Sequence, residues 1–162
     1  MGVGNIQSTY SNTIPLALPG GRYGDEGLFV SKTAQGAITY GYAVKRGTDT
    51  ETQVAVGASL TFVGFAAHTL SQEAAYSDQT INAQDTEILD VFLGDGFIWL
   101  SPSNAVTAGD ALKITTATGV PKGGAGVTGD TALAGAYWYS SCGAGGLALA
   151  ILPTAPVVSL VP

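Results

Sequence analysis

The chain has 162 residues, the usual size of one domain, and 46% of them are hydrophobic, which excludes a disordered chain and predicts a packed core. Charged residues make up only 11%, and the net charge of −6 with six scattered basic residues argues against nucleic acid as a partner. One Cys and one His exclude an internal disulfide and a Cys/His zinc site, and we expect neither a metal nor a cofactor.

The first 24 residues contain several Pro and Gly and one charge, at Arg22, and they fit neither a helix nor an alternating strand. They lack the basic and apolar segments of a signal peptide, so we expect synthesis in the cytoplasm. Apolar side chains recur here, at Ile6, Tyr10, Ile14, Leu16, Leu18 and Tyr23. The pattern predicts an extended N-terminal arm over residues 1–24, whereas a frayed terminus is the alternative.

From position 28 onward the pattern changes to short runs of β-branched and aromatic residues separated by glycines, which indicates strands. The first predicted strands are 28–34, 37–46, 52–56 and 60–65. The polar segment 45–52 predicts an exposed loop. Residues 66–82 are the one stretch where a short helix is expected, because Thr69 and Gln72 have the spacing of a capping box.

Further strands are predicted at 86–93, 96–101, 111–117, 135–141 and 147–152. Gly94-Asp95-Gly96 between the first two predicts a tight hairpin. Three other Gly-Asp pairs predict turns, at residues 24–25, 109–110 and 129–130. Nine or ten strands at this spacing predict an all-β fold, a single jelly-roll or barrel-like β-sandwich with at most one short helix. We assign the β domain to residues 25–153, between the arm and a C-terminal tail.

The C-terminal region is uncharged: after Asp130 the chain contains no Asp, Glu, Lys, Arg or His. Its longest apolar run ends at Pro153, well short of the ~20 residues of a membrane helix, so no membrane partner is expected. The tail, residues 154–162, reads TAPVVSLVP, and its prolines favour an edge strand or a strap on a neighbour over an interior strand. Ordinary docking on its own domain is the alternative.

The sequence contains partial motifs for catalysis and cofactor binding, but the strands, helices and turns that such sites require do not accompany them. Residues 124–129, GAGVTG, match G-x-G-x-x-G, but no strand precedes them and no long helix follows, so a flexible or tight-turn loop is favoured. A nucleophile such as Ser71, Ser141 or Cys142 with His68 as base lacks the G-x-S-x-G turn. We therefore expect no catalytic residue.

Acidic and aromatic residues leave a carbohydrate site open as an alternative. Asp85 and Glu87 are expected on one strand face with Asp90 nearby, a spacing that glycosidases also use, although any solvated strand face shows it. The candidates for a sugar-stacking platform are Trp99, Trp138, Tyr137 and Tyr139. The segment 136–140, AYWYS, sets Tyr137 and Tyr139 on one face and Trp138 on the other, so most of these rings are expected in the core or an interface.

Four segments, taken in order, resemble the structural cement, or capsid decoration, proteins of tailed bacteriophages. They are AVKRGTDTETQVAVGA (43–58), FVGFAAH (62–68), FIWLSPSNAVTAGDALKITTATG (97–119) and AYWYSSCGAGGLALAILP (136–153). The most characteristic piece is AVTAGDALKI after a strand that carries a Trp. The resemblance covers about residues 12–153.

This resemblance implies a small β-rich subunit on the outside of the phage head. Such a subunit binds at junctions between major capsid proteins and clamps them against the pressure of packaged DNA. The implied partners are the major capsid protein and copies of the chain itself, as a dimer or trimer. We expect the contact residues to be apolar and to lie in the arm and tail: Ile14, Leu16, Leu18, Tyr23, Val157, Val158 and Leu160. The alternative function is a carbohydrate-binding or adhesive β-sandwich on a virion exterior.

Overall fold

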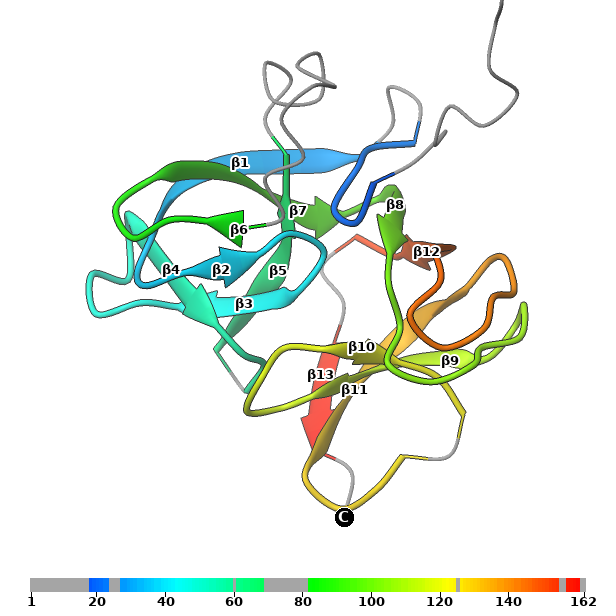
Figure 1. Cartoon of the computed structure of the whole chain (residues 1–162). Helices are drawn as coiled ribbons and strands as arrows, with labels where there is room; N and C mark the ends of the chain where they lie inside the picture. Colours follow the sequence, from blue (N-terminus) through cyan, green and yellow to red (C-terminus); the bar gives the residue numbers. More distant parts are fainter. Residues whose placement is uncertain are drawn as a thin grey trace, which may run out of the picture.

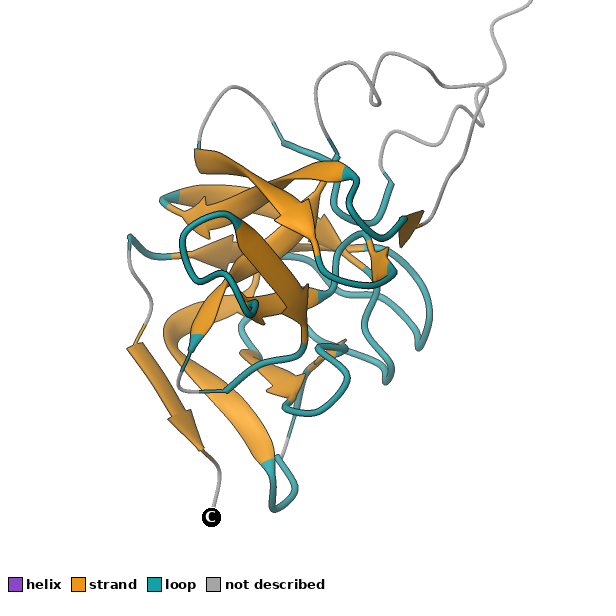
Figure 2. Cartoon of the chain, turned by 90° about the vertical axis from the view of Figure 1, so that its left-hand side faces the viewer, coloured by secondary structure: helices purple, strands orange, loops and turns teal. Residues whose placement is uncertain are grey.

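The computed structural model describes residues 18–23, 27–59, 61–68, 82–124, 126–154 and 157–160, the last of these for the backbone only (Figure 1). All regular structure in these ranges is β, and Figure 2 shows strands joined by loops. The strands are β1 (Leu28–Ala34), β2 (Ile38–Thr39), β3 (Ala43–Arg46), β4 (Gln53–Val56), β5 (Phe62–Ala67), β6 (Asn82–Ala83), β7 (Ile88–Gly94), β8 (Gly96–Leu100), β9 (Ala111–Thr115), β10 (Pro121–Lys122), β11 (Asp130–Trp138), β12 (Ala148–Leu152) and β13 (Val157–Leu160).

Five strands close into a small barrel in the order β1-β4-β3-β5-β7, at the upper left of Figure 1. β1 pairs with β4 in parallel, and the other neighbours are antiparallel. The interior of a barrel of this size is filled by side chains. One buried cluster consists of Ala34, Ile38, Tyr40, Val44, Val54, Ala66, Ala83, Leu89 and Val91.

A second sheet has the order β10-β9-β11-β12-β8, and β13 pairs with β11 on the side away from β9. The two units share one core, because a single buried cluster includes Phe65 of β5 and Phe92 of β7 together with Leu112 of β9 and Trp138 of β11. β11 changes partners along its length: residues 131–134 pair with β13, and Tyr137 and Trp138 pair with β12. The all-β, barrel-like fold is thereby confirmed, whereas a jelly-roll strand order is not.

The hairpin predicted at Gly94-Asp95-Gly96 is wrong. β7 pairs with β1 and β5, so both of its edges are occupied, and β8 pairs instead with β12 in the second sheet. Asp95 has a φ of 61° and Gly94 a φ of 134°, and this corner carries the chain from the barrel into the second sheet. The turn residues at 94–96 carry no information about the pairing of β7 with β1 and β5, which leaves β7 no edge for β8.

Three other expectations, for a strand, a helix and a loop, need correction or fall partly outside the described residues. The strand predicted over 37–46 is two strands, β2 and β3, because the chain turns at Tyr40 and Gly41, where Gly41 has a φ of 82°. Of the stretch predicted to allow a helix, residues 69–81 lie outside the described residues, while Ala66 and Ala67 belong to β5. The exposed loop predicted at 45–52 is the β3–β4 connection, although Lys45 and Arg46 belong to β3 itself.

Candidate interaction surface

An aromatic surface covers the outer face of the second sheet at β8. Along this strand Gly96, Ile98 and Leu100 are buried and Phe97 and Trp99 are half-buried, because successive side chains of a strand point to opposite faces. The outward rings meet others from distant parts of the chain. Tyr23 contacts Phe97 and Trp99 edge-on, with ring centroids 5.7 and 6.2 Å apart.

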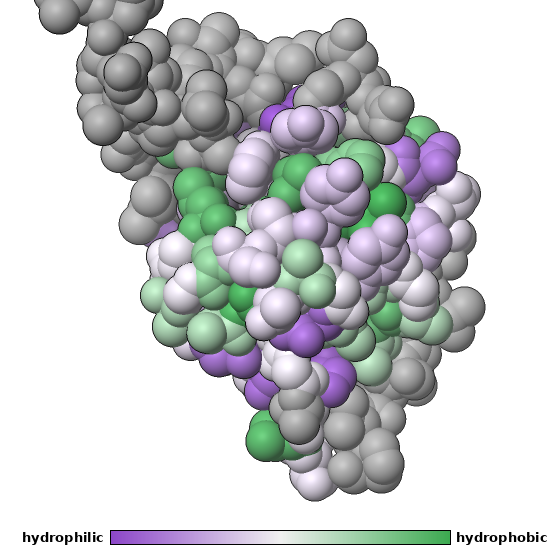
Figure 3. Space-filling model, turned by 90° about the vertical axis from the view of Figure 1, so that its right-hand side faces the viewer, coloured by the Kyte–Doolittle hydropathy of each residue, from purple (hydrophilic) through white to green (hydrophobic). Residues whose placement is uncertain are grey.

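Tyr139 extends this group of rings on the other side of Phe97, with centroids 5.1 Å apart. We call Tyr23, Phe97, Trp99 and Tyr139 the aromatic ridge. Tyr23 is 50% and Tyr139 57% exposed, although the burial of such large rings is energetically favourable. In Figure 3 most of the described surface is weakly polar or apolar, and strongly hydrophilic residues are few. The ridge is therefore available for contact with a partner.

A shallow cavity of about 280 Å³ adjoins the ridge at Phe97. Its wall contains the 40% exposed ring of Tyr137. The other lining residues are Asp95, Gly96, Gly135, Ile151, Leu152 and Pro153. Asp95 is the one charged residue in this lining, so the cavity fits an apolar side chain or a proline ring of a partner better than an ion.

The described part of the N-terminal arm is fixed to the edge of β8. Leu18 to Gly21 form a turn in which the Gly21 N–H donates to the Leu18 carbonyl oxygen at 2.8 Å. Pro19 followed by Gly20, with a φ of 75°, is the sequence that a type II turn requires. The Gly20 N–H then donates to the Trp99 carbonyl, and the Trp99 N–H donates to the Gly21 carbonyl. The arm thus pairs with β8 through an isolated antiparallel bridge between Arg22 and Ile98, which brings Tyr23 onto the ridge.

His68 lies beneath this turn and is 6% exposed. Its ring stacks on Tyr40, with centroids 3.9 Å apart, and its backbone N–H donates to the Gly20 carbonyl at 3.2 Å. Burial lowers the pKa of His68, and a hydrogen bond from the ring to the Pro19 carbonyl offsets part of that shift. A neutral imidazole therefore helps to hold the base of the arm.

Arg22 fixes the arm from the barrel side. Its guanidinium pairs with the Asp90 carboxylate of β7 and lies over the Phe29 ring, 3.8 Å from the centroid. Ser31 of β1 also donates to Asp90, at 2.8 Å. Through these contacts Arg22 joins the arm to the barrel strands β7 and β1.

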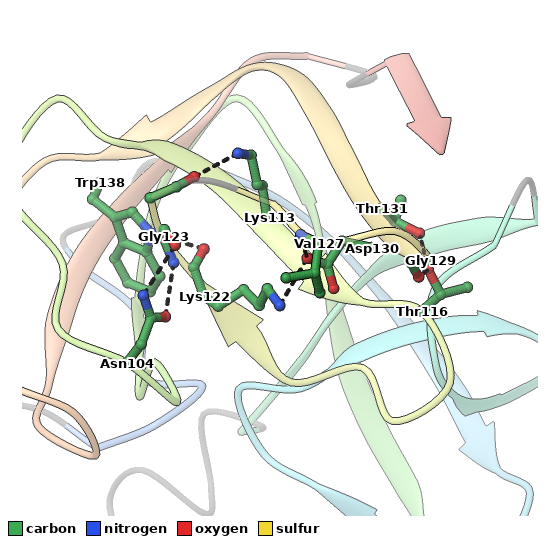
Figure 4. Close-up of polar contacts among 11 residues, drawn as sticks. Asn104, Lys113, Thr116, Lys122, Gly123, Val127, Gly129, Asp130, Thr131 and Trp138 are labelled. Atoms are coloured by element: carbon green, nitrogen blue, oxygen red, sulfur yellow. Dashed lines mark hydrogen bonds and ion pairs between the residues drawn. The ribbon is translucent and has the colours of Figure 1, made fainter. Parts of the chain in front are cut away.

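The loop between β10 and β11 is held by a polar cluster (Figure 4). The Lys122 ammonium and the Asp130 carboxylate are 2.7 Å apart, and the Val127 N–H donates to the same carboxylate at 2.7 Å. Burial alone would raise the pKa of Asp130, but the hydrogen bonds from Lys122 and Val127 and the charges of Lys122 and Lys113 together outweigh it and hold the pKa below its usual value. Asn104 exchanges two hydrogen bonds with the backbone of Gly123. The described residues of the GAGVTG motif, 124 and 126–129, lie in a loop, and Val127 is held there by Asp130.

The acidic residues considered for catalysis act as hydrogen-bond acceptors in turns. Asp85 accepts from the Gly36 N–H at 2.7 Å, and Glu87 accepts from the Gln84 N–H at 2.8 Å. Both precede β7, so the expectation that they share one strand face is wrong. Among the residues with described placement, no three His, Cys, Asp or Glu side chains are grouped as metal ligands.

The residues considered for a nucleophilic mechanism have separate neighbours. The Ser141 hydroxyl accepts from the Ala108 N–H at 2.9 Å, and burial raises the pKa of Cys142, which disfavours the thiolate. His68 contacts Tyr40 and the arm instead. Ser71 lies outside the described residues. This geometry gives none of the three described residues a partner for catalysis.

Of the two tryptophans, only Trp99 reaches the surface. Trp138 is fully buried, and its indole N–H donates to the Lys122 carbonyl at 3.2 Å. Trp99 is half-buried, with Tyr23 against it edge-on. The predicted alternation in AYWYS is confirmed, because Tyr137 and Tyr139 are exposed and Trp138 is not.

The contact residues expected from the sequence fall in three places. Tyr23 is part of the aromatic ridge, and Leu18 begins the turn beside β8. Ile14 and Leu16 lie outside the described residues. The tail residues Val157, Val158 and Leu160 belong to β13, which pairs with β11 of the same chain. Sequence reasoning missed Phe97 as a partly exposed residue, although its alternation with the buried Gly96 and Ile98 was a usable signal.

The fold and this surface define a small all-β protein with an apolar, aromatic face available for assembly. A family model described as "Structural cement protein (E217 gp24/Pam3 gp6)" matches residues 6–151, and the chain belongs to this family of phage structural proteins. No curated protein matches it.

The fold is shared with a solved structure titled "The capsid of Myoviridae Phage XM1". The TM-score is 0.64 at 16% sequence identity, and the match covers 90% of this chain and 98% of that chain. At this identity the likeness concerns the fold. Within the described residues no helix is both long and apolar enough to cross a bilayer.

Proposed function

We propose that this protein binds the outer surface of a phage head and clamps neighbouring major capsid proteins, which stabilises the shell against the pressure of packaged DNA. The observation that carries the proposal is membership of the structural cement family over residues 6–151. The aromatic ridge supports it, because the described part of the chain leaves two of its rings, Tyr23 and Tyr139, at least half exposed. In this role the protein is synthesised in the host cytoplasm, joins the head from outside and catalyses no reaction.

Stabilisation follows from repetition. Burial of apolar surface contributes roughly 25 cal/mol per Å², so the rings of one ridge give a modest contact. Icosahedral symmetry repeats that contact over the shell, and a clamp that touches two capsid proteins resists their separation at every copy. The arm residues Ile14, Leu16 and Leu18 are proposed to extend this contact from the ridge, since the arm is fixed beside β8.

The test is binding of the purified full chain to heads that lack it, followed by heating of the loaded heads. We expect saturable binding and a higher temperature of DNA release. Phe97→Ser with Tyr139→Ser removes two ridge rings, and binding is expected to weaken about tenfold or more, because interface aromatics of this kind contribute 2 kcal/mol or more.

Ile88→Ser is the matched control, since Ile88 is 61% exposed on barrel strand β7 and does not belong to the ridge. It is expected to bind as the wild type does. Absence of any binding by the wild type would overturn the proposed function. Full binding by the double variant would overturn only the role of the ridge.

A further inference from the structure

The aromatic ridge is assembled from three separate segments of the chain. Phe97 and Trp99 belong to β8, Tyr139 follows β11, and Tyr23 comes from the arm. The ring of Tyr23 is 5.7 Å from Phe97 and 6.2 Å from Trp99 between centroids, and these contacts require the arm to lie along β8. The ridge is therefore complete only while the arm is attached.

One side chain of the arm stands out by its charge. Backbone hydrogen bonds attach the arm to β8 through Gly20 and Gly21, which contribute no side chain. Arg22 is the one charged residue among the first 24, yet its side chain is only 17% exposed. Burial of a guanidinium is costly unless the group is paired, so its position indicates a specific partner.

The partner of Arg22 is Asp90 of β7, whose side chain is 13% exposed. The guanidinium pairs with this carboxylate and lies over the Phe29 ring, 3.8 Å from its centroid, while Ser31 donates to the same carboxylate. A planar guanidinium can form an ion pair with its N–H groups and a ring contact with its face at the same time. Both contacts fix Arg22 to the barrel, and the next residue, Tyr23, is held against the rings of β8.

We propose that Arg22 is a positioning residue of the head-binding surface: its pairing with Asp90 keeps the arm on β8 and so supplies the fourth ring of the ridge. Arg22 acts through that ring and does not itself contact the shell. The effect on head binding rests on the proposed function, whereas the effect on the arm does not. Loss of the pair lowers the fraction of molecules with a complete ridge, and the apparent affinity for heads decreases with that fraction.

Acrylamide quenching of tryptophan fluorescence measures the attachment of the arm without heads. Trp138 is fully buried, and Trp99 is half-buried with Tyr23 against it, so the quenched emission comes from Trp99. Arg22→Gln is expected to raise the quenching constant, because Trp99 loses the cover of Tyr23. Arg46→Gln is the matched control, since it removes the only other arginine, an exposed residue of β3, and it is expected to leave the constant unchanged.

Asp90→Asn tests the ion pair from its other side. Asn keeps the size of the side chain without its charge, so the quenching of Trp99 is expected to rise as it does in Arg22→Gln. The double variant is expected to show no larger rise than either single variant, because both remove the same interaction. If Arg22→Gln unfolds the chain, Trp138 is quenched as well, and Asp90→Asn then decides.

Binding to heads distinguishes a positioning role from a direct contact with the shell. Arg22→Gln and Tyr23→Ser are each expected to weaken binding by about tenfold. The double variant is expected to bind no more weakly than Tyr23→Ser alone, since Arg22 acts through that ring. Arg46→Gln is expected to bind as the wild type does.

Three outcomes would overturn the proposal: unchanged quenching of Trp99 in both single variants, full binding of heads by Arg22→Gln, or losses of affinity that add up in the double variant. The last would mean that Arg22 contacts the shell itself. A wild type that binds no heads would overturn the proposed function, and quenching would still decide whether Arg22 positions the arm.

Discussion

Gly20 shows how one residue fixes the arm. Its φ of 75° favours glycine, and a Cβ there would lie 2.6 Å from the Ala66 carbonyl oxygen and 2.8 Å from the Gly41 nitrogen. Gly36 has nearly the same φ, 79°, but a Cβ there would meet no atom within 4 Å. An alanine at Gly36 would therefore lose stability only through its backbone conformation, whereas an alanine at Gly20 would also lose stability through close packing.

Gly36→Ala is expected to lower the free energy of unfolding by about 1–2 kcal/mol, the usual cost of a left-handed conformation for a residue with a side chain. Gly20→Ala adds a steric conflict with the backbone of β5, and its loss is expected to be larger by about 1–3 kcal/mol. Urea unfolding of both variants and the wild type measures the difference. Equal losses would mean that the arm is not packed at Gly20.

His68 makes the stability of the same region depend on pH. Its pKa is lowered from the ordinary value of 6.5, chiefly by burial, so the unfolded chain takes up a proton at a higher pH than the folded chain does. The free energy of unfolding therefore decreases as the pH falls through 6.5 toward the folded pKa, and this loss is absent above 6.5.

The measurement is the free energy of unfolding on both sides of pH 6.5 for the wild type and for His68→Gln. Gln keeps a donor for the Pro19 carbonyl but does not titrate. The wild type is expected to lose more stability than the variant when the pH is lowered. A constant difference between the two proteins across this range would contradict the role given to His68.

At the scale of elements, local sequence predicts where strands lie but not which strands pair. Alternation of apolar and polar residues is a local signal, and it placed β1, β8, β9 and β12 within a few residues. Pairing depends on which edges other strands already occupy. β7 is flanked by β1 and β5, which the sequence near Gly94 does not reveal, so the turn there was read as a hairpin.

The same reason explains how much of the aromatic ridge could be foreseen. The outward positions of Phe97 and Trp99 follow from alternation in the FIWL segment. That Tyr23 joins them depends on hydrogen bonds between the arm and Trp99, a contact between segments more than seventy residues apart. Tyr23 was expected at an interface because the arm is apolar, and the partner rings on β8 became visible only with the fold.

The distribution of charge over the whole molecule determines how its assembly responds to salt. The net charge of −6 lies in the first 130 residues, whereas the aromatic ridge contains no charged residue and β13 lies in the uncharged C-terminal region. Contacts through such surfaces gain their free energy from apolar burial and backbone hydrogen bonds, which salt screens little. Repulsion between acidic copies is long-range and is screened.

Binding to heads is therefore expected to be unchanged or stronger when the ionic strength rises, because the Debye screening length decreases from about 30 Å at 0.01 M to about 8 Å at 0.15 M. Titrations of heads with the full chain at these two salt concentrations measure the effect. A clear loss of affinity with salt would mean that ion pairs dominate the contact, and the charged loops of the barrel rather than the ridge would then be the surfaces that meet the shell.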